Sequence, residues 1–215
     1  MKTVVTILMV WLAGITMAQE AGVFYLYVRA DETLIEEHKV ETTSDRPVLT
    51  GYSIGISIPD ELLETVKQVT AELVSEKLGV QSGMLYVSNK KGKEKVTAGT
   101  ELFPGMPFVN KGTAIKTEEK KYYVHIYADI RAQGSVSTNL SKTKKRKPMI
   151  ELRLTVCDAS GETYFKNKAV LRDFGVLQSS SRIKGKVKVI NAEVLTPESI
   201  VGMYIAALEA SLFNE

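Results

Sequence analysis

The sequence predicts an α+β fold in which an antiparallel, meandering sheet carries two amphipathic helices packed on one face. Three observations predict it: two long runs that alternate between apolar and polar residues, two segments with apolar residues at helical spacing, and turn residues between these elements. Alternation over eight or more residues is typical of a strand with one buried and one wet face. The 215 residues, 44% of them hydrophobic and 25% charged, suit one domain with a full core.

Two alternating runs, residues 122–131 and 150–157, form the predicted centre of the sheet. Their apolar positions, which we expect on the buried face, are Val124, Ile126, Ala128, Ile130, Ile150, Leu152, Leu154 and Val156. Residues 163–171 follow a turn at Gly161 and predict a third strand of the meander. An aromatic and β-branched run at 23–28 has no strongly polar face, which favours a strand in the interior of the sheet.

The first predicted helix follows a strand expected at 52–58. Pro59 suits the first helical turn, and the acidic residues Asp60 and Glu61 complement the positive end of the helix dipole. We expect the helix to end at Gly79, because glycine adopts a left-handed conformation at little cost. Its central apolar stripe is Leu62, Val66, Val69 and Leu73, with Leu63, Thr70, Val74 and Leu78 flanking it.

A second amphipathic helix closes the chain. Thr196 is a natural N-cap, and Pro197 and Glu198 suit the first turn that follows it. The apolar stripe of this helix is Val201, Tyr204, Ile205, Leu208 and Leu212. Because each helix is apolar along one side, we expect both helices to cover the same face of the sheet in a two-layer sandwich.

Three stretches are expected to be loops. Residues 99–117 contain prolines, which exclude a central strand, among apolar residues that favour a loop packed on the body. Residues 132–148 are polar and rich in Ser, Thr and Lys, which predicts a long hairpin loop of the kind that often carries function. Three serines at 179–181 predict a further loop before a short strand at 186–190.

The N-terminus predicts a secretory signal peptide over residues 1–18, followed by a single α+β domain over residues 19–215. Lys2 precedes an apolar run of about a dozen residues, and small residues lead to a cleavage site after Ala18. A membrane anchor would need about 20 apolar residues, and this run ends sooner, at Gln19. We therefore expect an exported mature chain, periplasmic or extracellular, without a transmembrane segment.

Charge and metal-ligating residues argue against several classes of function. Residues 1–18 contain one lysine and no acidic residue, so cleavage would change the net charge from +3 to +2, which does not favour nucleic acid as a partner. Cys157 is the one cysteine, so the chain can form neither an internal disulfide nor a cysteine metal cluster. His38 follows Glu36 and Glu37, but adjacent strand residues do not converge on one metal ion. We expect no metal and no cofactor.

The most reaction-like cluster is a row on the polar face of the first central strand. His125, Tyr127 and Asp129 are spaced two residues apart and therefore share a face, and Tyr123 and Arg131 extend the row. His125 and Asp129 are the candidate catalytic residues, because an imidazole and a carboxylate can exchange protons with a substrate. A solvated strand face is the simpler interpretation.

Two groups of residues are the expected partner surface. Tyr123 and Tyr127 are aromatic residues on the polar strand face. The second group is basic and lies in the predicted loop at 132–148: Lys142, Lys144, Lys145, Arg146 and Lys147. Such a cluster could contact an envelope protein or an anionic envelope surface, while a solvated run of charge is again the simpler interpretation.

These observations favour a non-catalytic exported protein, a binding or assembly module of the bacterial periplasm or cell envelope. The layout resembles that of many small α+β proteins of the bacterial envelope, without a shared motif. Two alternatives stay open. One is a small secreted hydrolase or isomerase that uses the strand face around His125; the other is a self-associating structural envelope protein in which one helix packs its stripe against another chain. The sequence names no ligand and does not determine the oligomeric state.

Overall fold

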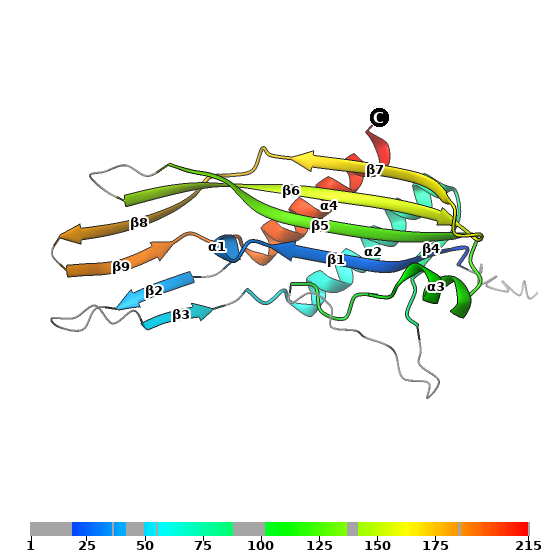
Figure 1. Cartoon of the computed structure of the whole chain (residues 1–215), viewed down its shortest axis with the longest axis horizontal. Coiled ribbons are helices and arrows are strands. Elements are labelled where there is room, and N and C mark those ends of the chain that lie inside the picture. Colours follow the sequence, from blue (N-terminus) through cyan, green and yellow to red (C-terminus); the bar gives the residue numbers. More distant parts are fainter. Residues whose placement is uncertain are drawn as a thin grey trace, which may run out of the picture.

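The computed structural model describes residues 19–35, 37–41, 50–54, 56–87, 102–136, 142–184 and 186–214 (Figure 1). The strands are β1 (Ala21–Ala30), β2 (Glu37–Glu41), β3 (Thr50–Ile54), β4 (Ser82–Met84), β5 (Tyr122–Val136), β6 (Lys142–Asp158), β7 (Thr163–Leu171), β8 (Leu177–Lys184) and β9 (Lys186–Ala192). The helices are α1 (Glu32–Ile35), α2 (Asp60–Leu78), α3 (Lys111–Thr117) and α4 (Pro197–Phe213).

Most strands belong to one mixed sheet with the order β4-β1-β5-β6-β8-β9, in which β7 also pairs with β6; β2 and β3 form a separate pair. β1 runs parallel to both β4 and β5, whereas β5, β6 and β7 are antiparallel neighbours. The α+β class is confirmed, and β5, β6 and β7 form the predicted antiparallel meander, but the sheet as a whole is mixed because β1 pairs in parallel. The cause is a crossover: the chain leaves β1, forms α2 and returns in the same direction, as parallel neighbours require.

The alternating residues of β5 and β6 pair as their pattern predicts. The register places apolar residues directly opposite one another, for example Ile126 opposite Leu154 and Ile130 opposite Ile150. These side chains have at most 1% of their surface exposed, and they belong to the main hydrophobic core together with residues of α2 and α4. We call this side of the sheet the inner face and the opposite side the outer face.

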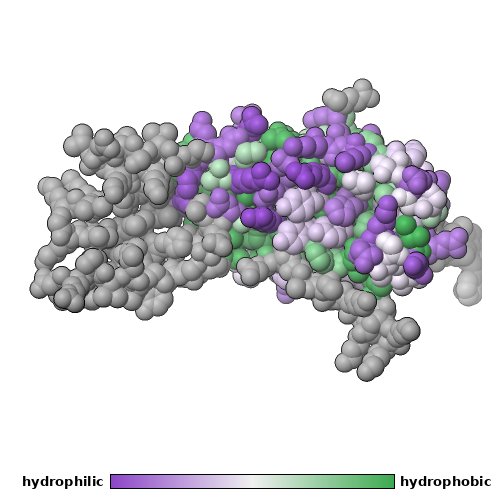
Figure 2. Space-filling model, in the orientation of Figure 1, coloured by the Kyte–Doolittle hydropathy of each residue, from purple (hydrophilic) through white to green (hydrophobic). Residues whose placement is uncertain are grey.

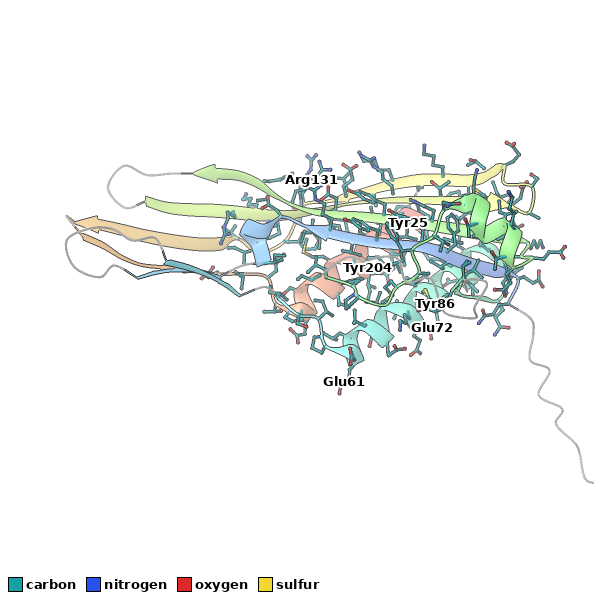
Figure 3. All side chains as sticks on the ribbon, turned by 60° about the horizontal axis from the view of Figure 1, so that its bottom comes forward. Tyr25, Glu61, Glu72, Tyr86, Arg131 and Tyr204 are labelled. Carbon is teal, nitrogen blue, oxygen red and sulfur yellow. The ribbon has the colours of Figure 1, made fainter. Side chains whose placement is uncertain are left out.

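Both long helices lie on the inner face, as predicted (Figure 1). α4 packs against β6, β7 and α2, and the side-chain amide of Asn167 in β7 donates to the carbonyl oxygen of Ser211 over 2.9 Å. The hydroxyls of Thr70 in α2 and Tyr204 in α4 form a buried hydrogen bond of 2.9 Å. Glu61 and Glu72 of α2 point away from the sheet (Figure 3).

The buried side of α2 is rotated from the predicted stripe. Its buried residues are Leu63, Val66, Thr70 and Val74, whereas Leu62, Val69 and Leu73 are half-buried. The helix packs against α4 and β4, so its contacts fall on the flank of the stripe. The predicted end of α2 is confirmed, because Gly79 has φ of 64° and its N–H donates to the carbonyl oxygen of Ser75.

Two of the predicted loops are strands instead. β5 continues to Val136 and β6 begins at Lys142, so most of the polar stretch 132–148 belongs to a long antiparallel ribbon. The serines at 179–181 lie within β8, which pairs with the beginning of β6. Backbone pairing with neighbouring strands holds these residues in the sheet even though their polar side chains break the apolar alternation.

Pro148 is tolerated in β6 because it lies where that strand changes partner. On one side of β6, pairing with β8 extends as far as Arg146, and pairing with β7 begins at Ile150. Pro148 falls between these two ladders. A residue without an N–H is best accommodated at such an interruption.

The segment before α3 wraps around the edge of β1. Phe103 and Met106 are buried in the inner core, whereas Val109 belongs to a smaller cluster on the outer face. Between them, the N–H of Leu26 donates to the carbonyl oxygen of Pro107 over 2.9 Å. The prediction of a packed loop is thus confirmed for residues 102–110, but residues 111–117 form helix α3.

Candidate functional site

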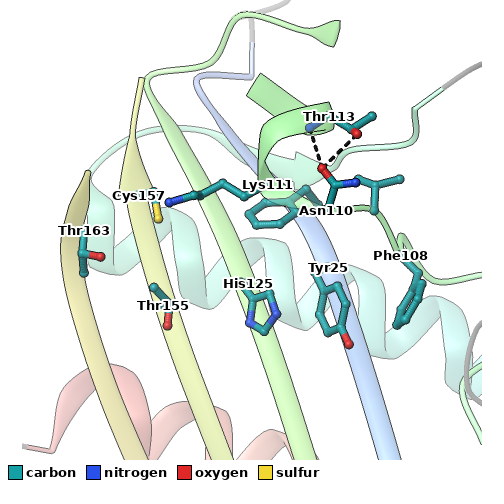
Figure 4. A pocket seen from close by; sticks show the side chains of 11 residues that line it. Tyr25, Phe108, Asn110, Lys111, Thr113, His125, Thr155, Cys157 and Thr163 are labelled. Carbon is teal, nitrogen blue, oxygen red and sulfur yellow. Dashed lines mark hydrogen bonds between the residues drawn. The ribbon is translucent and has the colours of Figure 1, made fainter. Parts of the chain in front are cut away.

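A pocket of about 660 Å³ lies on the outer face of the sheet, on the side opposite α2 and α4 (Figure 4). The first residues of α3 and the loop before it form one side, and strands β1, β5, β6 and β7 form the floor. Its lining residues are Phe24, Tyr25, Phe108, Val109, Asn110, Lys111, Thr113, His125, Thr155, Cys157 and Thr163. Sequence reasoning selected only His125 among these as a site residue.

Three aromatic rings lie side by side in the pocket (Figure 4). The imidazole of His125 stacks on the ring of Tyr25, with 4.1 Å between centroids and 12° between planes. The ring of Phe108 lies 4.6 Å from that of Tyr25 on its other side. The rings therefore form a continuous apolar wall, to which Tyr27 and Tyr127 add a second stacked pair further along the strands.

An irregularity in β1 explains why two successive aromatic residues reach this face. The register between β1 and β5 shifts between Val23 and Tyr25, which marks a β-bulge. Val23 and Leu26 belong to the inner core, whereas Phe24 packs in the outer cluster and Tyr25 packs against it. The sequence signal for this was the run at 23–28 with apolar residues on both faces.

The environment of His125 favours the neutral imidazole. Desolvation by burial lowers the pKa of His125 below its usual value of 6.5, and no aspartate or glutamate is among the described residues that line the pocket. Without a carboxylate to orient it or stabilise its charged form, the ring serves as an aromatic wall. A general acid–base role would require such a partner.

The two candidate catalytic residues are not brought together. His125 and Asp129 are four residues apart on one strand, which separates them by about 13 Å at the usual rise of a strand. Asp129 is outside the pocket and buried, with 5% of its surface exposed. Its Oδ2 accepts hydrogen bonds from Nε and Nη2 of Arg131 at 2.6 and 2.5 Å, so its carboxylate is paired with an arginine of its own strand.

The thiol of Cys157 lines the pocket and is buried. Cys157 lies opposite Tyr123 in the register of β5 and β6, whereas His125 lies opposite Thr155. Cys157 and His125 are therefore diagonal neighbours, at the roughly 7–8 Å typical of such pairs. The described contacts include no hydrogen bond between the two side chains, of the kind by which a base activates a nucleophile.

Lys111 contributes the positive charge of the pocket. Its side chain extends from the start of α3 over the strands towards Cys157 (Figure 4). The ammonium donates a hydrogen bond of 2.8 Å to the carbonyl oxygen of Gly161, in the turn between β6 and β7. Nearby, Asn110 accepts from the backbone and hydroxyl of Thr113 and thereby caps α3.

The prediction that Tyr123 is an exposed contact residue is wrong. Tyr123 has 1% of its surface exposed and packs beneath α3 with Phe24, Leu85 and Ala114. Its hydroxyl donates to the carbonyl oxygen of Glu118 at 2.8 Å. A short helix covers this part of the polar strand face, and strand alternation alone does not reveal such a cover.

The other predicted contact residues lie in different environments. Tyr127 is half-buried on the outer face, beneath the guanidinium of Arg153. Arg146 is buried with 8% of its surface exposed, and its Nη2 donates to the carbonyl oxygen of Glu193 at 2.8 Å. Lys147 is exposed. The side chains of Lys142, Lys144 and Lys145 lie outside the described part. The basic contact surface therefore stays a prediction, and Arg146 no longer belongs to it.

Many side chains on the rest of the outer face are polar. Figure 2 shows hydrophilic side chains spread over the strands that face the viewer. Within the described ranges, no three His, Cys, Asp or Glu side chains gather closely enough to hold a metal ion. None of the helices in the described part of the chain is long and apolar enough to cross a membrane.

Comparison with known proteins identifies no family. No family model matches the chain, and no curated protein matches it. Among solved structures, it is similar to one described as a homolog of a neuraminyllactose-binding hemagglutinin from Helicobacter pylori, with a TM-score of 0.36 and 8% sequence identity over 90% of this chain and 81% of that chain. Similarity at this level assigns neither a fold family nor a ligand.

Proposed function

We propose that the protein is an exported, non-catalytic binding module that takes a small ligand with an apolar, ring-shaped body in the pocket beside α3. The observation that carries this proposal is the wall formed by Tyr25, His125 and Phe108 in a concave site of about 660 Å³. Ligand sites of about 300–1,000 Å³ with mostly apolar walls and a few polar groups are typical of small-molecule binding.

The described geometry favours binding over catalysis. An enzyme that used His125 would need a carboxylate or another titratable partner within hydrogen-bond reach of the imidazole. Two titratable groups, Lys111 and Cys157, also line the pocket, but the described contacts include no hydrogen bond from either one to the imidazole, and Thr155 and Thr163 contribute hydroxyls. These groups can orient a ligand but form no proton-transfer pair with one another.

The helices give little support to the alternative of a self-associating structural protein. In that hypothesis one helix packs its apolar stripe against another chain. Tyr204 and Leu208 of α4 and Val66 and Val74 of α2 are instead fully buried within their own chain. Self-association would therefore need a different surface.

The proposal is tested by dye binding to a variant with a filled pocket. N-phenylnaphthylamine is a neutral fluorescent probe that joins a naphthalene to a phenyl ring and brightens in apolar surroundings. Thr155→Trp should fill the floor of the pocket and weaken the binding of this dye at least tenfold. Val170→Trp, an exposed outer-face position of β7 away from the pocket, should leave binding unchanged. Equal binding by both variants and the original protein would refute the proposal.

Cys157 provides a second readout for the same pocket. It is the one cysteine of the chain and it lines the cavity. The rate at which a thiol-specific reagent modifies it should therefore fall when N-phenylnaphthylamine is bound. Circular dichroism on each variant confirms that the fold is retained. Modification at the same rate with and without saturating dye would place the dye elsewhere.

A further inference from the structure

We infer that Lys111 makes this pocket selective for an anionic ligand, one that joins a carboxylate-like or sulfonate-like group to an apolar ring body. The inference rests on the proposed function, because it names the chemical class of ligand for the same pocket. Two relationships carry it: the pairing of the Lys111 ammonium with a neutral carbonyl, and the neutrality of the surfaces around it.

The ammonium of Lys111 retains capacity to bind an anion. Within the described ranges it donates one hydrogen bond, to the carbonyl oxygen of Gly161, and an ammonium carries three N–H donors. Among the described residues that line the pocket there is no carboxylate to neutralise it. The bond to Gly161 also fixes the position of the charge, because it joins the start of α3 to the β6–β7 turn.

The acidic residue that begins this turn is occupied within the turn itself. Oδ1 of Asp158 accepts hydrogen bonds from the backbone N–H and the hydroxyl of Ser160, at 2.9 and 2.6 Å. It also accepts from the backbone N–H of Glu162 at 3.0 Å. The carboxylate is therefore directed into its own turn, which leaves a backbone carbonyl, a weaker partner, for Lys111.

The walls next to Lys111 carry no opposing charge. The rings of Tyr25 and Phe108 are uncharged, and burial keeps the imidazole of His125 neutral near pH 7. An anionic group placed at Lys111 would meet the ammonium as a donor, and the hydroxyls of Thr155 and Thr163 line the same pocket. The ring body attached to it would lie along the aromatic wall. Charge-assisted hydrogen bonds of this kind are about twice as strong as neutral ones.

Two dyes with the same ring skeleton test the inference. Anilinonaphthalene sulfonate differs from N-phenylnaphthylamine by one sulfonate group, so the ratio of their affinities isolates the contribution of the anion. Lys111→Gln should lower the affinity for the sulfonate dye about tenfold, equivalent to about 1.4 kcal/mol, and leave the neutral dye unchanged. Lys111→Arg should restore the preference. Lys116→Gln, which removes an exposed cation from the same helix outside the pocket, is the matched control.

The outcomes separate the inference from the proposal beneath it. If both dyes bind in a manner that Thr155→Trp abolishes but Lys111→Gln leaves their ratio unchanged, the inference is wrong and the proposed function stands. If Lys116→Gln changes the ratio as much as Lys111→Gln, the preference comes from general charge and the inference is also wrong. If Thr155→Trp affects neither dye, both the inference and the proposed function fail.

Discussion

Asp129 and Glu151 lie directly opposite each other on the outer faces of β5 and β6. Only 5% of the surface of Asp129 and 7% of that of Glu151 is exposed, and like charges in facing positions destabilise a sheet. Each carboxylate is paired with the arginine two positions further along its own strand, Arg131 or Arg153. Glu151 also contacts Lys168 of β7 at 3.1 Å. This charge network explains why the acidic residue of the predicted catalytic row has a structural role.

The network predicts a loss of stability in acid that depends on Glu151. Hydrogen bonds from Arg153 and Lys168 lower the pKa of Glu151 below its usual 4.5. The folded state then binds fewer protons than the unfolded state, so this stabilisation is present above the unfolded pKa and is lost as the pH falls through the folded pKa. Glu151→Gln should reduce the decline in the free energy of unfolding below about pH 4.5, as measured by urea titrations. Glu61→Gln, at an exposed carboxylate of α2, should not.

The hydrogen bond between Thr70 and Tyr204 predicts energetic coupling between α2 and α4. Tyr204→Phe and Thr70→Val should each lower the free energy of unfolding by about 1–2 kcal/mol. Each substitution removes this hydrogen bond and leaves the other hydroxyl buried without its partner. The double variant should be less destabilised than the sum of the two, with a coupling energy of about 1 kcal/mol. Denaturant unfolding of the four proteins measures it. Additive effects would show that the bond contributes nothing.

Truncation should destabilise the protein at Arg146 of β6 but have little effect at its neighbour Lys147. Arg146→Ala removes a buried side chain that donates to the carbonyl oxygen of Glu193, and should lower the free energy of unfolding by about 2 kcal/mol or more. Lys147→Ala, at an exposed position, should change it by no more than about 0.5 kcal/mol. Thermal or urea unfolding compares the two. Equal effects would contradict the burial of Arg146.

The predicted contact between the basic residues and an anionic envelope surface is tested with a variant that keeps the buried Arg146. We expect the triple replacement of Lys144, Lys145 and Lys147 by Ser to weaken binding to vesicles that contain phosphatidylglycerol, more strongly at low salt. Arg146 stays unchanged in this variant, because its loss would destabilise the protein. Cosedimentation with vesicles gives the measurement, and neutral phosphatidylcholine vesicles are the control. Unaltered binding would remove this segment from the partner surface.

Export remains a prediction from residues 1–18 and is tested on the mature product. Expression with the full sequence in a bacterial host should yield a protein outside the cytoplasm whose N-terminus is Gln19. Mass spectrometry of the intact protein measures this directly. A product that retains Lys2 and stays in the cytosol would contradict the signal peptide. Replacing the apolar residues Leu8 and Val10 with Asp should block both export and cleavage, because the central apolar run is what the export machinery recognises.

The sequence alone determined the elements whose pattern is local. Alternation in β5 and β6 identified their inner face correctly, since the period of a strand depends only on the backbone. The N-cap at Thr196 and the end of α2 at Gly79 followed from the hydrogen-bonding and conformational preferences of single residues. The apolar stripe of α4 was also predicted well. This helix packs against both the sheet and α2, so a small error in the predicted direction of its apolar side still leaves the same residues buried.

Tertiary structure decided everything that depends on contacts between distant segments. A strand pattern assigns residues to a face but does not show what covers that face, so the burial of Tyr123 under α3 and of Arg146 beside Glu193 was not predictable. The parallel pairing of β1 with β5 joins segments about a hundred residues apart in sequence. The alternation of residues within one strand does not show which distant strand it pairs with. The pocket arises from the same cause. Its lining comes from β1, β5, β6, β7, α3 and the segment before α3, and only the packing of these elements brings Tyr25, His125 and Lys111 around one cavity.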